Sequence, residues 1–476
     1  MRATLRVLAD DERAEVHERT LRVLSRTGVR VDTSLGRRLL ADAGAHVDEE
    51  SRRVRFPAAL VEHCVTLCPR RFDLGGRRPG FAAAMNAGDC TLLADGGATQ
   101  VCEGPGGDRR QPTRRDWLDS TRLLDVIDEV GLYWQMVEYP RDTDGAGGWV
   151  EHWSELFRLF GKHVQDSLPD ATTAVWLREV LDVVFGGAEA VRQRRPFSFL
   201  ITPTSPLVIE GEHTEAWLAL KDMGMPVAVM PMPLMGATSP AGLAATVVQA
   251  NCETLAALCL VQVAAPGTPV IYAPVLAAAD PRTGAYAAGA IEASVMAAAG
   301  TEMARFYGLA VEASGCTTNA HEPGVQAAYE KATTLLMSAL AWPDILVGPG
   351  LLAGATVFSA EQLIIDVELF GLSRQAMRGV DAGPQLWLDD VLGSVGPGGG
   401  FLGEKSTRRN ARSGEWRLTD LGVHPSYESW VRQGRPDVVA EARERIEALL
   451  ARHEPMEYDE DQQKALAALA TRARRA

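Results

Sequence analysis

Short hydrophobic runs alternate with longer amphipathic helical patterns through the central part of the chain. Each run is followed by Gly, Pro, Ser or Thr and then by apolar residues at helical spacing, and a first helix is predicted to begin at Thr113. Such alternation is typical of parallel strands joined by helical crossovers. The runs that we predict to be strands are residues 132–137, 163–166, 197–201, 227–230, 270–272, 309–312 and 345–347. These runs span roughly 220 residues and leave an eighth strand to be located, which favours a closed (β/α)8 barrel of the TIM type over an open doubly wound sheet.

The first 110 residues follow a different pattern, in which helices and short extended pieces are mixed. Helices are predicted at residues 1–28, 34–43 and 57–67. The runs 90–93 and 99–102 flank Asp95-Gly-Gly97, which is a turn signal. We therefore predict three parts, which are an N-terminal α+β extension (1–110), the barrel (111–435) and a C-terminal helical segment (436–476).

Four segments that follow predicted strands are rich in turn residues and hydroxyl groups rather than in charge. In a barrel such segments lie at the carboxyl ends of the strands, where ligands bind. Ordinary βα turns are the alternative for any one of them. Together they predict one neutral pocket, lined by backbone groups and by thioethers from Met230, Met232 or Met235. The segments are residues 202–206, 231–240, 314–319 and 348–350.

Charge and composition narrow the class of protein. The formal net charge of −14 argues against a nucleic-acid partner, because phosphate contacts need a basic face. No apolar run of about 18 residues is present, so no membrane span is expected. The N-terminus lacks the apolar core of a signal peptide, which predicts a cytoplasmic protein.

The cysteines do not form a recognisable metal or disulfide pattern. Cys64 and Cys68 are four residues apart in a helical pattern beside His63, but no second ligand pair follows. Buried thiols therefore explain them better than a zinc site, and no bound metal is predicted.

Several motifs resemble those of the trimethylamine methyltransferase family. They occur in the family's order from about residue 20 to residue 450, so the resemblance covers nearly the whole chain. It is a strong indication of family and fold and a weaker one of substrate. The motifs are Gly28-Val-Arg-Val-Asp32, Leu39-Leu-Ala-Asp-Ala-Gly44, Pro203-Thr-Ser-Pro-Leu207, Pro231-Met-Pro-Leu-Met-Gly-Ala-Thr238, Gln249-Ala-Asn-Cys-Glu253, Gln326-Ala-Ala-Tyr-Glu-Lys331, Phe358-Ser-Ala-Glu-Gln-Leu-Ile-Ile-Asp-Val-Glu368 and Val395-Gly-Pro-Gly-Gly-Gly-Phe-Leu-Gly403.

The resemblance implies a barrel that removes a methyl group from a methylamine or a betaine. The usual acceptor is the Co(I) of a corrinoid bound to a small separate protein. No pyrrolysine is present, so the chain is similar to the non-pyrrolysine branch, which includes glycine betaine methyltransferases. A quaternary ammonium or a sulfonium fits this branch, because it leaves as a neutral molecule and needs mainly to be oriented for in-line attack.

Aromatic side chains near the first predicted barrel strand are candidates for holding a methylated cation. They are Tyr133, Trp134 and Tyr139. Since successive strand side chains face opposite ways, Tyr133 and Trp134 cannot both point inward. Core packing is the alternative for each ring.

Polar candidates are concentrated after the sixth predicted strand, the region that carries pyrrolysine in the other branch. We assign His321 and Glu330 as catalytic residues, with Glu330 and Glu361 matching acids of the family. Salt bridges on helix surfaces are the alternative for the two acids, and helix–strand hydrogen bonds for the amide on the helix that follows the 231–240 segment. The remaining substrate-binding candidates are Thr204, Met235, Asn251, Cys316, Thr317 and Asn319.

One segment departs from the family. The family has histidines after its Gly-Pro-Gly-Gly run, whereas residues 400–410 contain none. If those histidines serve the corrinoid or its carrier protein, the acceptor here could instead be tetrahydrofolate, or the chain could be a non-catalytic binder of methylated osmolytes. A homo-oligomer is expected from the family, and the helical patterns show no coiled-coil heptads that would settle it.

Overall fold

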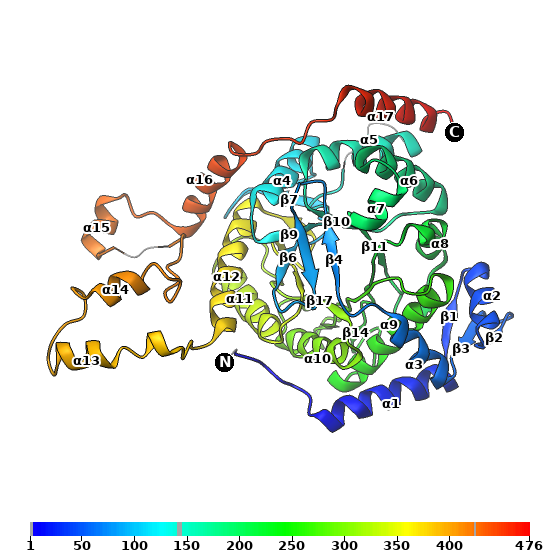
Figure 1. Ribbon diagram of the computed structural model, residues 1–476, viewed down its shortest axis with the longest axis horizontal. Helices are drawn as coiled ribbons and strands as arrows, with labels where there is room; N and C mark the ends of the chain where they lie inside the picture. Colours follow the sequence, from blue (N-terminus) through cyan, green and yellow to red (C-terminus); the bar gives the residue numbers. More distant parts are fainter. Residues whose placement is uncertain (1–2, 140–144, 423–424) are drawn as a thin grey trace.

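Eight short parallel strands form a closed barrel at the centre of the molecule (Figure 1). The computed structural model describes residues 3–139, 145–422 and 425–476. Strands that are neighbours in space follow one another in the chain, and β18 pairs with β6 to close the ring. The predicted barrel is therefore confirmed. Its strands are β6 (Thr91–Leu93), β9 (Val130–Tyr133), β10 (His163–Asp166), β11 (Phe197–Ile201), β13 (Val227–Val229), β15 (Val270–Tyr272), β17 (Ala310–Ser314) and β18 (Ile345–Val347).

The barrel strands are buried on both faces, which explains why most of them appear in the sequence as continuous apolar runs. One face packs against the surrounding helices, and the other points into the barrel, where Leu93, Leu132, Leu200, Ile271 and Ile345 belong to one cluster. The outer helices are α4 (Arg114–Val126), α5 (Ala146–Leu159), α6 (Ala171–Phe185), α7 (Ala188–Arg194), α8 (Gly211–Leu220), α9 (Leu243–Ala264), α10 (Ile291–Tyr307), α11 (Val325–Leu340) and α12 (Ala360–Arg378).

The eighth strand is β6, and it lies within the stretch that we assigned to the N-terminal extension. That assignment was wrong for this strand, which pairs with β9 on one side and β18 on the other. The Asp95-Gly-Gly97 turn does not join two paired strands either, because β7 (Gln100–Cys102) pairs with β20 (Val357–Phe358) and β8 (Arg109–Arg110). A strand of three residues is too short for its pattern to distinguish a barrel strand from a hairpin arm.

The N-terminal residues form two separate structures, a layer of helices and strands beside α9 and a hairpin at one end of the barrel. Helices α1 (Asp10–Arg26), α2 (Ser34–Asp42) and α3 (Ala58–Leu67) pack against α9. Beside them lies a sheet of β1 (Val29–Val31), β2 (His46–Asp48), β3 (Arg53–Arg55) and β12 (Val208–Ile209).

A hairpin of β4 (Phe72–Gly75) and β5 (Ala82–Met85) closes the N-terminal end of the barrel. Phe72, Leu74 and Met85 join the cluster of side chains inside the barrel. Because this end is plugged, the open end is the one formed by the carboxyl ends of the strands.

Two small sheets build up that open end. One pairs β14 (Leu234–Met235) with β16 (Ala277–Ala278), and the other places β19 (Leu351–Leu352) beside β20, β7 and β8. They add walls to the barrel beyond the ends of its strands.

The chain leaves the barrel after α12 and forms an arm, described for residues 379–422 and 425–436, that extends away from it (Figure 1). The barrel helices therefore end well before the boundary expected at residue 435. The arm contains α13 (Asp389–Val395), α14 (Lys405–Asn410) and α15 (Tyr427–Arg432). The chain then returns, so that α16 (Val438–Leu450) packs on α12 and α4, and α17 (Glu460–Ala473) packs on α5 and α6.

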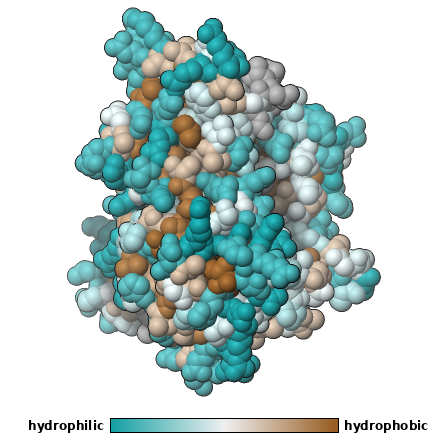
Figure 2. All heavy atoms as spheres, turned by 90° about the vertical axis from the view of Figure 1, so that its right-hand side faces the viewer, coloured by the Kyte–Doolittle hydropathy of each residue, from teal (hydrophilic) through white to brown (hydrophobic). Residues whose placement is uncertain are grey.

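Helix α9 is long and apolar enough to cross a membrane, but 78% of its most apolar window is buried within the protein. It packs against α1, α3 and α10, which explains its composition as that of a core helix. Figure 2 shows one face of the molecule, on which hydrophobic side chains form an irregular band with hydrophilic side chains around it.

Candidate active site

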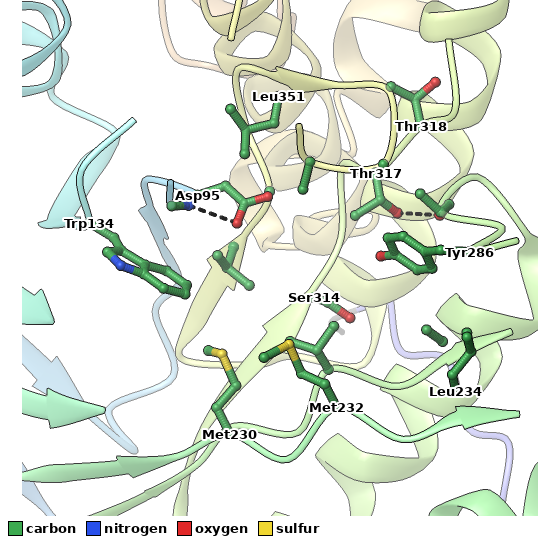
Figure 3. A pocket seen from close by; sticks show the side chains of 18 residues that line it. Asp95, Trp134, Met230, Met232, Leu234, Tyr286, Ser314, Thr317, Thr318 and Leu351 are labelled. Atoms are coloured by element: carbon green, nitrogen blue, oxygen red, sulfur yellow. Dashed lines mark hydrogen bonds between the residues drawn. The ribbon is translucent and has the colours of Figure 1, made fainter. Parts of the chain in front are cut away.

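A cavity of about 390 Å³ lies at the open end of the barrel (Figure 3). This volume is within the range of small-molecule sites, roughly 300–1,000 Å³. The lining residues end or follow β6, β9, β13, β15, β17 and β18. They are Asp95, Gly96, Trp134, Met230, Met232, Leu234, Val275, Ala277, Tyr286, Ala288, Ser314, Thr317, Thr318, Val347, Gly348, Leu351, Gly354 and Ala355.

Three of the four segments predicted to meet around a hollow do so, namely 231–240, 314–319 and 348–350. The prediction was wrong for 202–206, from which no residue lines the cavity. That segment is held by α9 instead, since Ser205 Oγ and the backbone N–H of Leu207 donate to the carboxylate of Glu253. From there the chain enters β12 and the N-terminal sheet.

A layer of polar side chains crosses the interior of the barrel. Nε2 of Gln165, on β10, donates a hydrogen bond of 2.8 Å to Oε2 of Glu312, on β17. These two strands lie on opposite sides of the ring, so the bond spans its interior. Ser198 donates to Oε1 of Gln165 and lies 2.9 Å from Nε2 of His163. The other carboxylate oxygen of Glu312, Oε1, is buried and has no hydrogen-bond partner among the described residues.

Asp95 follows β6 directly and presents a carboxylate to the cavity. Its Oδ1 accepts a hydrogen bond of 2.9 Å from the backbone N–H of Gly96. Desolvation raises the pKa of Asp95 to about 6, although this hydrogen bond and the charge of Lys331 oppose the rise. At neutral pH the carboxylate is therefore mostly ionised, and the prediction of a neutral pocket was wrong.

Glu312 is the second acid close to the cavity. Desolvation raises its pKa to about 8, and the nearby Asp95 contributes to the rise while the hydrogen bond from Gln165 opposes it. At pH 7 Glu312 is therefore mostly protonated while Asp95 is mostly charged. Asp95 is therefore the acid that gives the site its negative charge at pH 7.

Two aromatic rings and two thioethers surround Asp95. In Figure 3 the indole of Trp134 and the ring of Tyr286 face the cavity from opposite sides, and Met230 and Met232 lie below them. Gly96 leaves room for the indole, because a Cβ at this position would lie 2.3 Å from Cε2 of Trp134. Burial and the charge of Asp95 raise the pKa of Tyr286 to about 12, so its hydroxyl stays neutral.

A buried ion pair fixes the segments that follow β17 and β18. Nζ of Lys331 lies 2.8 Å from Oδ2 of Asp366 and also donates to the carbonyl oxygens of Cys316 and Gly348. Burial lowers the pKa of Lys331, but Asp366, Cys316 and Asp95 together outweigh that effect and hold it above the usual value. Only glycine fits at position 348, where φ is 134° and a Cβ would lie 1.8 Å from the carbonyl oxygen of Gly315.

The fold and the site can now be set beside known proteins. A family model described as trimethylamine methyltransferase (MTTB) matches residues 1–476, the whole chain. The chain belongs to the trimethylamine methyltransferase family. It is an enzyme that transfers methyl groups.

Curated members of the family match over nearly their full length. Trimethylamine methyltransferase MttB2 of Methanosarcina mazei is 29% identical, covering 99% of this chain and 96% of that protein. Glycine betaine methyltransferase of Desulfitobacterium hafniense is 27% identical, covering 95% of this chain and 94% of that protein. The solved monomethylamine methyltransferase (MtmB) of Methanosarcina barkeri is 13% identical, with a TM-score of 0.47 and 92% of each chain covered.

Two of the residues expected to bind substrate in this methyltransferase line the cavity, Trp134 and Thr317. Tyr133 faces the other way, as strand alternation requires, with its hydroxyl 3.3 Å from Thr121 Oγ1 of α4. Tyr139 stacks on His152 at a centroid distance of 4.6 Å, outside the cavity.

Three of the other expected residues hold the structure around the cavity without lining it. Asn319 receives a hydrogen bond from the backbone N–H of Gly289 and donates to the carbonyl of Tyr286. Glu330 accepts hydrogen bonds from Thr318 Oγ1 and from the backbone N–H of Asn319. Cys316 is buried below the rim, at the carbonyl that Lys331 contacts.

The remaining expected residues lie away from the cavity. Asn251 is buried between α9, α1 and α10, where it hydrogen-bonds to Tyr272, Tyr307 and Thr20. The backbone of Thr204 pairs with Val208, and Met235 belongs to β14. His321 is exposed, with its Nδ1 2.6 Å from Nη2 of Arg109. Glu361 is paired with Arg443. Their positions do not support contact with a substrate in this cavity.

Sequence reasoning missed the groups that give the site its charge. Asp95 was assigned to a turn, although a carboxylate after the apolar run 91–94 is also what the end of a barrel strand presents to a ligand. Glu312 ends a predicted strand, and an acid in an otherwise apolar run signals a polar group inside the barrel. Tyr286 lies in an irregular loop whose sequence carries no comparable signal.

Proposed function

We propose that the cavity binds a small quaternary amine, the class to which betaines belong, and that the enzyme transfers one of its methyl groups to a corrinoid on a separate carrier protein. Asp95, Trp134 and Tyr286 surround one cavity at the open end of the barrel, and this arrangement is the observation that carries the proposal. Aromatic faces attract a desolvated cation by roughly 0.5–2 kcal/mol each. The carboxylate supplies the counter-charge without which a buried cation is costly.

The site charge supports a permanent cation rather than a neutral amine. With Asp95 ionised and Glu312 protonated, the side chains of the pocket carry one uncompensated negative charge at pH 7. Lys331 does not neutralise it, because Asp366 is already its partner. One bound ammonium ion restores neutrality.

The transfer itself needs no proton from this chain. The acceptor supplies the electron pair that forms the new bond to carbon, and the C–N pair returns to nitrogen, so that the amine leaves uncharged. The residues of the pocket bind the cation, exclude water and orient one methyl group toward the open end. This division of work is consistent with a site whose charged groups are carboxylates facing a cation.

The acceptor is tested by spectroscopy of the corrinoid. The chain is mixed with a carrier protein reduced to Co(I) and with a panel of quaternary amines, and the methyl-Co(III) spectrum is followed. The proposal expects methylation that depends on the amine and on Asp95. Methyl transfer to tetrahydrofolate without corrinoid would show that the folate is the acceptor instead. Tight binding of the amine with no product in either assay would show that the protein is a non-catalytic binder.

We further propose that the enzyme is a cytoplasmic homo-oligomer. The seven cysteines are free thiols, as suits a reducing compartment. The arm exposes large apolar side chains, including those of Trp387, Leu402, Trp416 and Leu418, and such exposure is typical of contact surfaces. Light scattering is expected to show a dimer or larger species that Leu402→Asp and Leu418→Asp together weaken, whereas a monomer at micromolar concentration would contradict it.

A further inference from the structure

We infer that the methyl donor is a monocation with no acid group of its own, a small trimethylammonium compound whose remaining substituent is neutral. The inference rests on the proposed function and narrows it, because it moves the substrate away from the betaines, which carry a carboxylate. Family membership does not make this choice, since the relatives bear the names of both trimethylamine and glycine betaine methyltransferases.

The cavity contains a charged partner for a cation and no cationic side chain for a carboxylate. Among the lining residues of the described part of the chain, Asp95 is the charged one, and no Lys, Arg or His is present. A betaine would place its own carboxylate within the same small space as Asp95. Two carboxylates confined to so small a cavity and shielded from water repel each other strongly.

The ammonium group of Lys331, a buried cation near the cavity, already has an ion-pair partner and hydrogen-bond acceptors. The side chain of Lys331 is fully buried, and its ammonium group meets Asp366 Oδ2 at 2.8 Å, the carbonyl of Cys316 at 2.7 Å and the carbonyl of Gly348 at 3.3 Å. Three N–H donors thus face three acceptors. A substrate carboxylate could not recruit Lys331 without breaking the contacts that fix the rim.

Two of the four hydroxyl groups of the lining, those of Thr317 and Thr318, already donate to the protein, and the other two, of Ser314 and Tyr286, carry no positive charge to offset a carboxylate. Thr317 Oγ1 donates to the carbonyl of Ala288 at 2.7 Å, and Thr318 Oγ1 donates to Glu330 at 2.5 Å. Both therefore turn their hydrogen atoms toward the protein and their lone pairs toward other groups. They can accept from a neutral hydroxyl of a ligand but cannot donate to an anion.

A second acid deepens the preference for a cation. Glu312 lies on the barrel strand that also carries Ser314 of the lining, two residues further on and on the same face. Its buried Oε1 has no hydrogen-bond partner in the described structure, and ionisation of this acid would add a negative charge that a cation, but not a ligand carboxylate, can offset. Asp95 and Glu312 together form a site to which a ligand carboxylate would add a third acid.

The test compares three ligands of similar shape that differ in charge. Choline is the monocation, glycine betaine carries the additional carboxylate, and 3,3-dimethylbutan-1-ol replaces the nitrogen of choline with carbon. Their dissociation constants are measured by calorimetry for the full-length enzyme and for Asp95→Asn. Asp89→Asn is the matched control, because Asp89 precedes β6 as Asp95 follows it, and its side chain is exposed at the opposite end of the barrel.

We expect choline to bind at least tenfold more tightly than either other ligand. Asp95→Asn should weaken choline at least tenfold and leave the neutral alcohol within twofold, and Asp89→Asn should change neither. Glycine betaine binding as tightly as choline, or a choline affinity that does not change in Asp95→Asn, would overturn the inference. Tight choline binding with no methyl transfer to any acceptor would overturn the proposed function alone, and transfer from glycine betaine with choline inert would overturn this inference alone.

Discussion

Asp95 is expected to act on the binding of the cation more than on the chemical step. The positive charge of the ammonium disperses as the C–N bond breaks, so the attraction to Asp95 is stronger in the ground state than in the transition state. Asp95→Asn should therefore raise KM about tenfold, the loss expected for roughly 1.4 kcal/mol of a charge-assisted contact, and change kcat less than about threefold. Steady-state kinetics check this, with Asp89→Asn as the control. A large fall in kcat at unchanged KM would instead indicate a role in the transfer itself.

The affinity for a cation should depend on pH through the same two acids. Burial raises both pKa values, to about 6 for Asp95 and about 8 for Glu312. A cation favours the ionised forms, so binding should strengthen as pH rises through 6 and again through 8. The neighbouring groups keep their state over this range, since the pKa of Tyr286 is about 12, that of His163 about 4, and that of Lys331 is above its usual value.

Titration of tetramethylammonium binding by calorimetry between pH 5 and pH 9 measures this dependence. Asp95→Asn should remove the lower step and leave the upper one. Affinity that is constant, or that falls as pH rises, would show that these carboxylates do not face the bound cation.

At the scale of elements, hydrogen bonds from α11 hold the segment between β17 and α11 in place. Glu330 accepts hydrogen bonds of 2.5 Å from Thr318 Oγ1 and 2.9 Å from the N–H of Asn319, and Asn319 in turn holds the loop of Tyr286. Glu330 is therefore a positioning residue in this structure.

Glu330→Gln and Glu330→Ala separate positioning from acid–base catalysis. The amide oxygen of Gln can still accept from Asn319, so Glu330→Gln should keep kcat within about threefold with an unaltered pH profile, while Glu330→Ala should raise KM several-fold. Loss of activity in Glu330→Gln together with a lost limb of the pH profile would restore the catalytic role predicted from sequence.

The elements differ in how well their sequences predict them. The seven runs from 132 to 347 were located because they are apolar on both faces and are bounded by Gly, Pro, Ser or Thr, and β10, β11, β15 and β18 have the predicted limits. The run 90–93 was predicted to be extended, but β6 was not recognised as a barrel strand, because it precedes the alternation of strands and helices that begins at Thr113. Asp95 was missed with it, since that residue becomes a ligand-facing group only once β6 is a barrel strand.

Family motifs identified the family but not the direction of each side chain. Asn251 and Glu361 belong to such motifs and turn out to bind neighbouring helices and Arg443. Spacing along a helix tells which residues share a face, whereas the partner of that face is decided by packing between distant segments.

At the scale of the whole molecule, the site costs stability. Glu312 has a pKa of about 8 in the folded protein and an ordinary one when unfolded, so the unfolded state loses its proton first. The free energy of unfolding should therefore fall as pH rises from about 4.5 to 8. The amide oxygen of Glu312→Gln can still accept from Gln165, and the variant has no acid to ionise, so it should be more stable than the parent by up to roughly 5 kcal/mol at pH 8.5 and equal to it near pH 4. Denaturant unfolding at both pH values measures the difference. A less stable variant at pH 8.5 would show that the carboxylate itself is needed for the fold.

The architecture as a whole gives the substrate one way in. The β4–β5 hairpin fills the N-terminal end of the barrel, and the polar layer of Gln165 and Glu312 crosses its interior. The methyl acceptor must therefore approach from the open end, above Asp95, Trp134 and Tyr286.

A crystal structure with arsenocholine, in which arsenic replaces the nitrogen of choline, tests the central claim most directly, because anomalous scattering from arsenic locates the cation without ambiguity. The account predicts one strong peak in the cavity, beside the carboxylate of Asp95 and between the rings of Trp134 and Tyr286. A peak elsewhere on the molecule, or no peak in the cavity at saturating ligand, would contradict it.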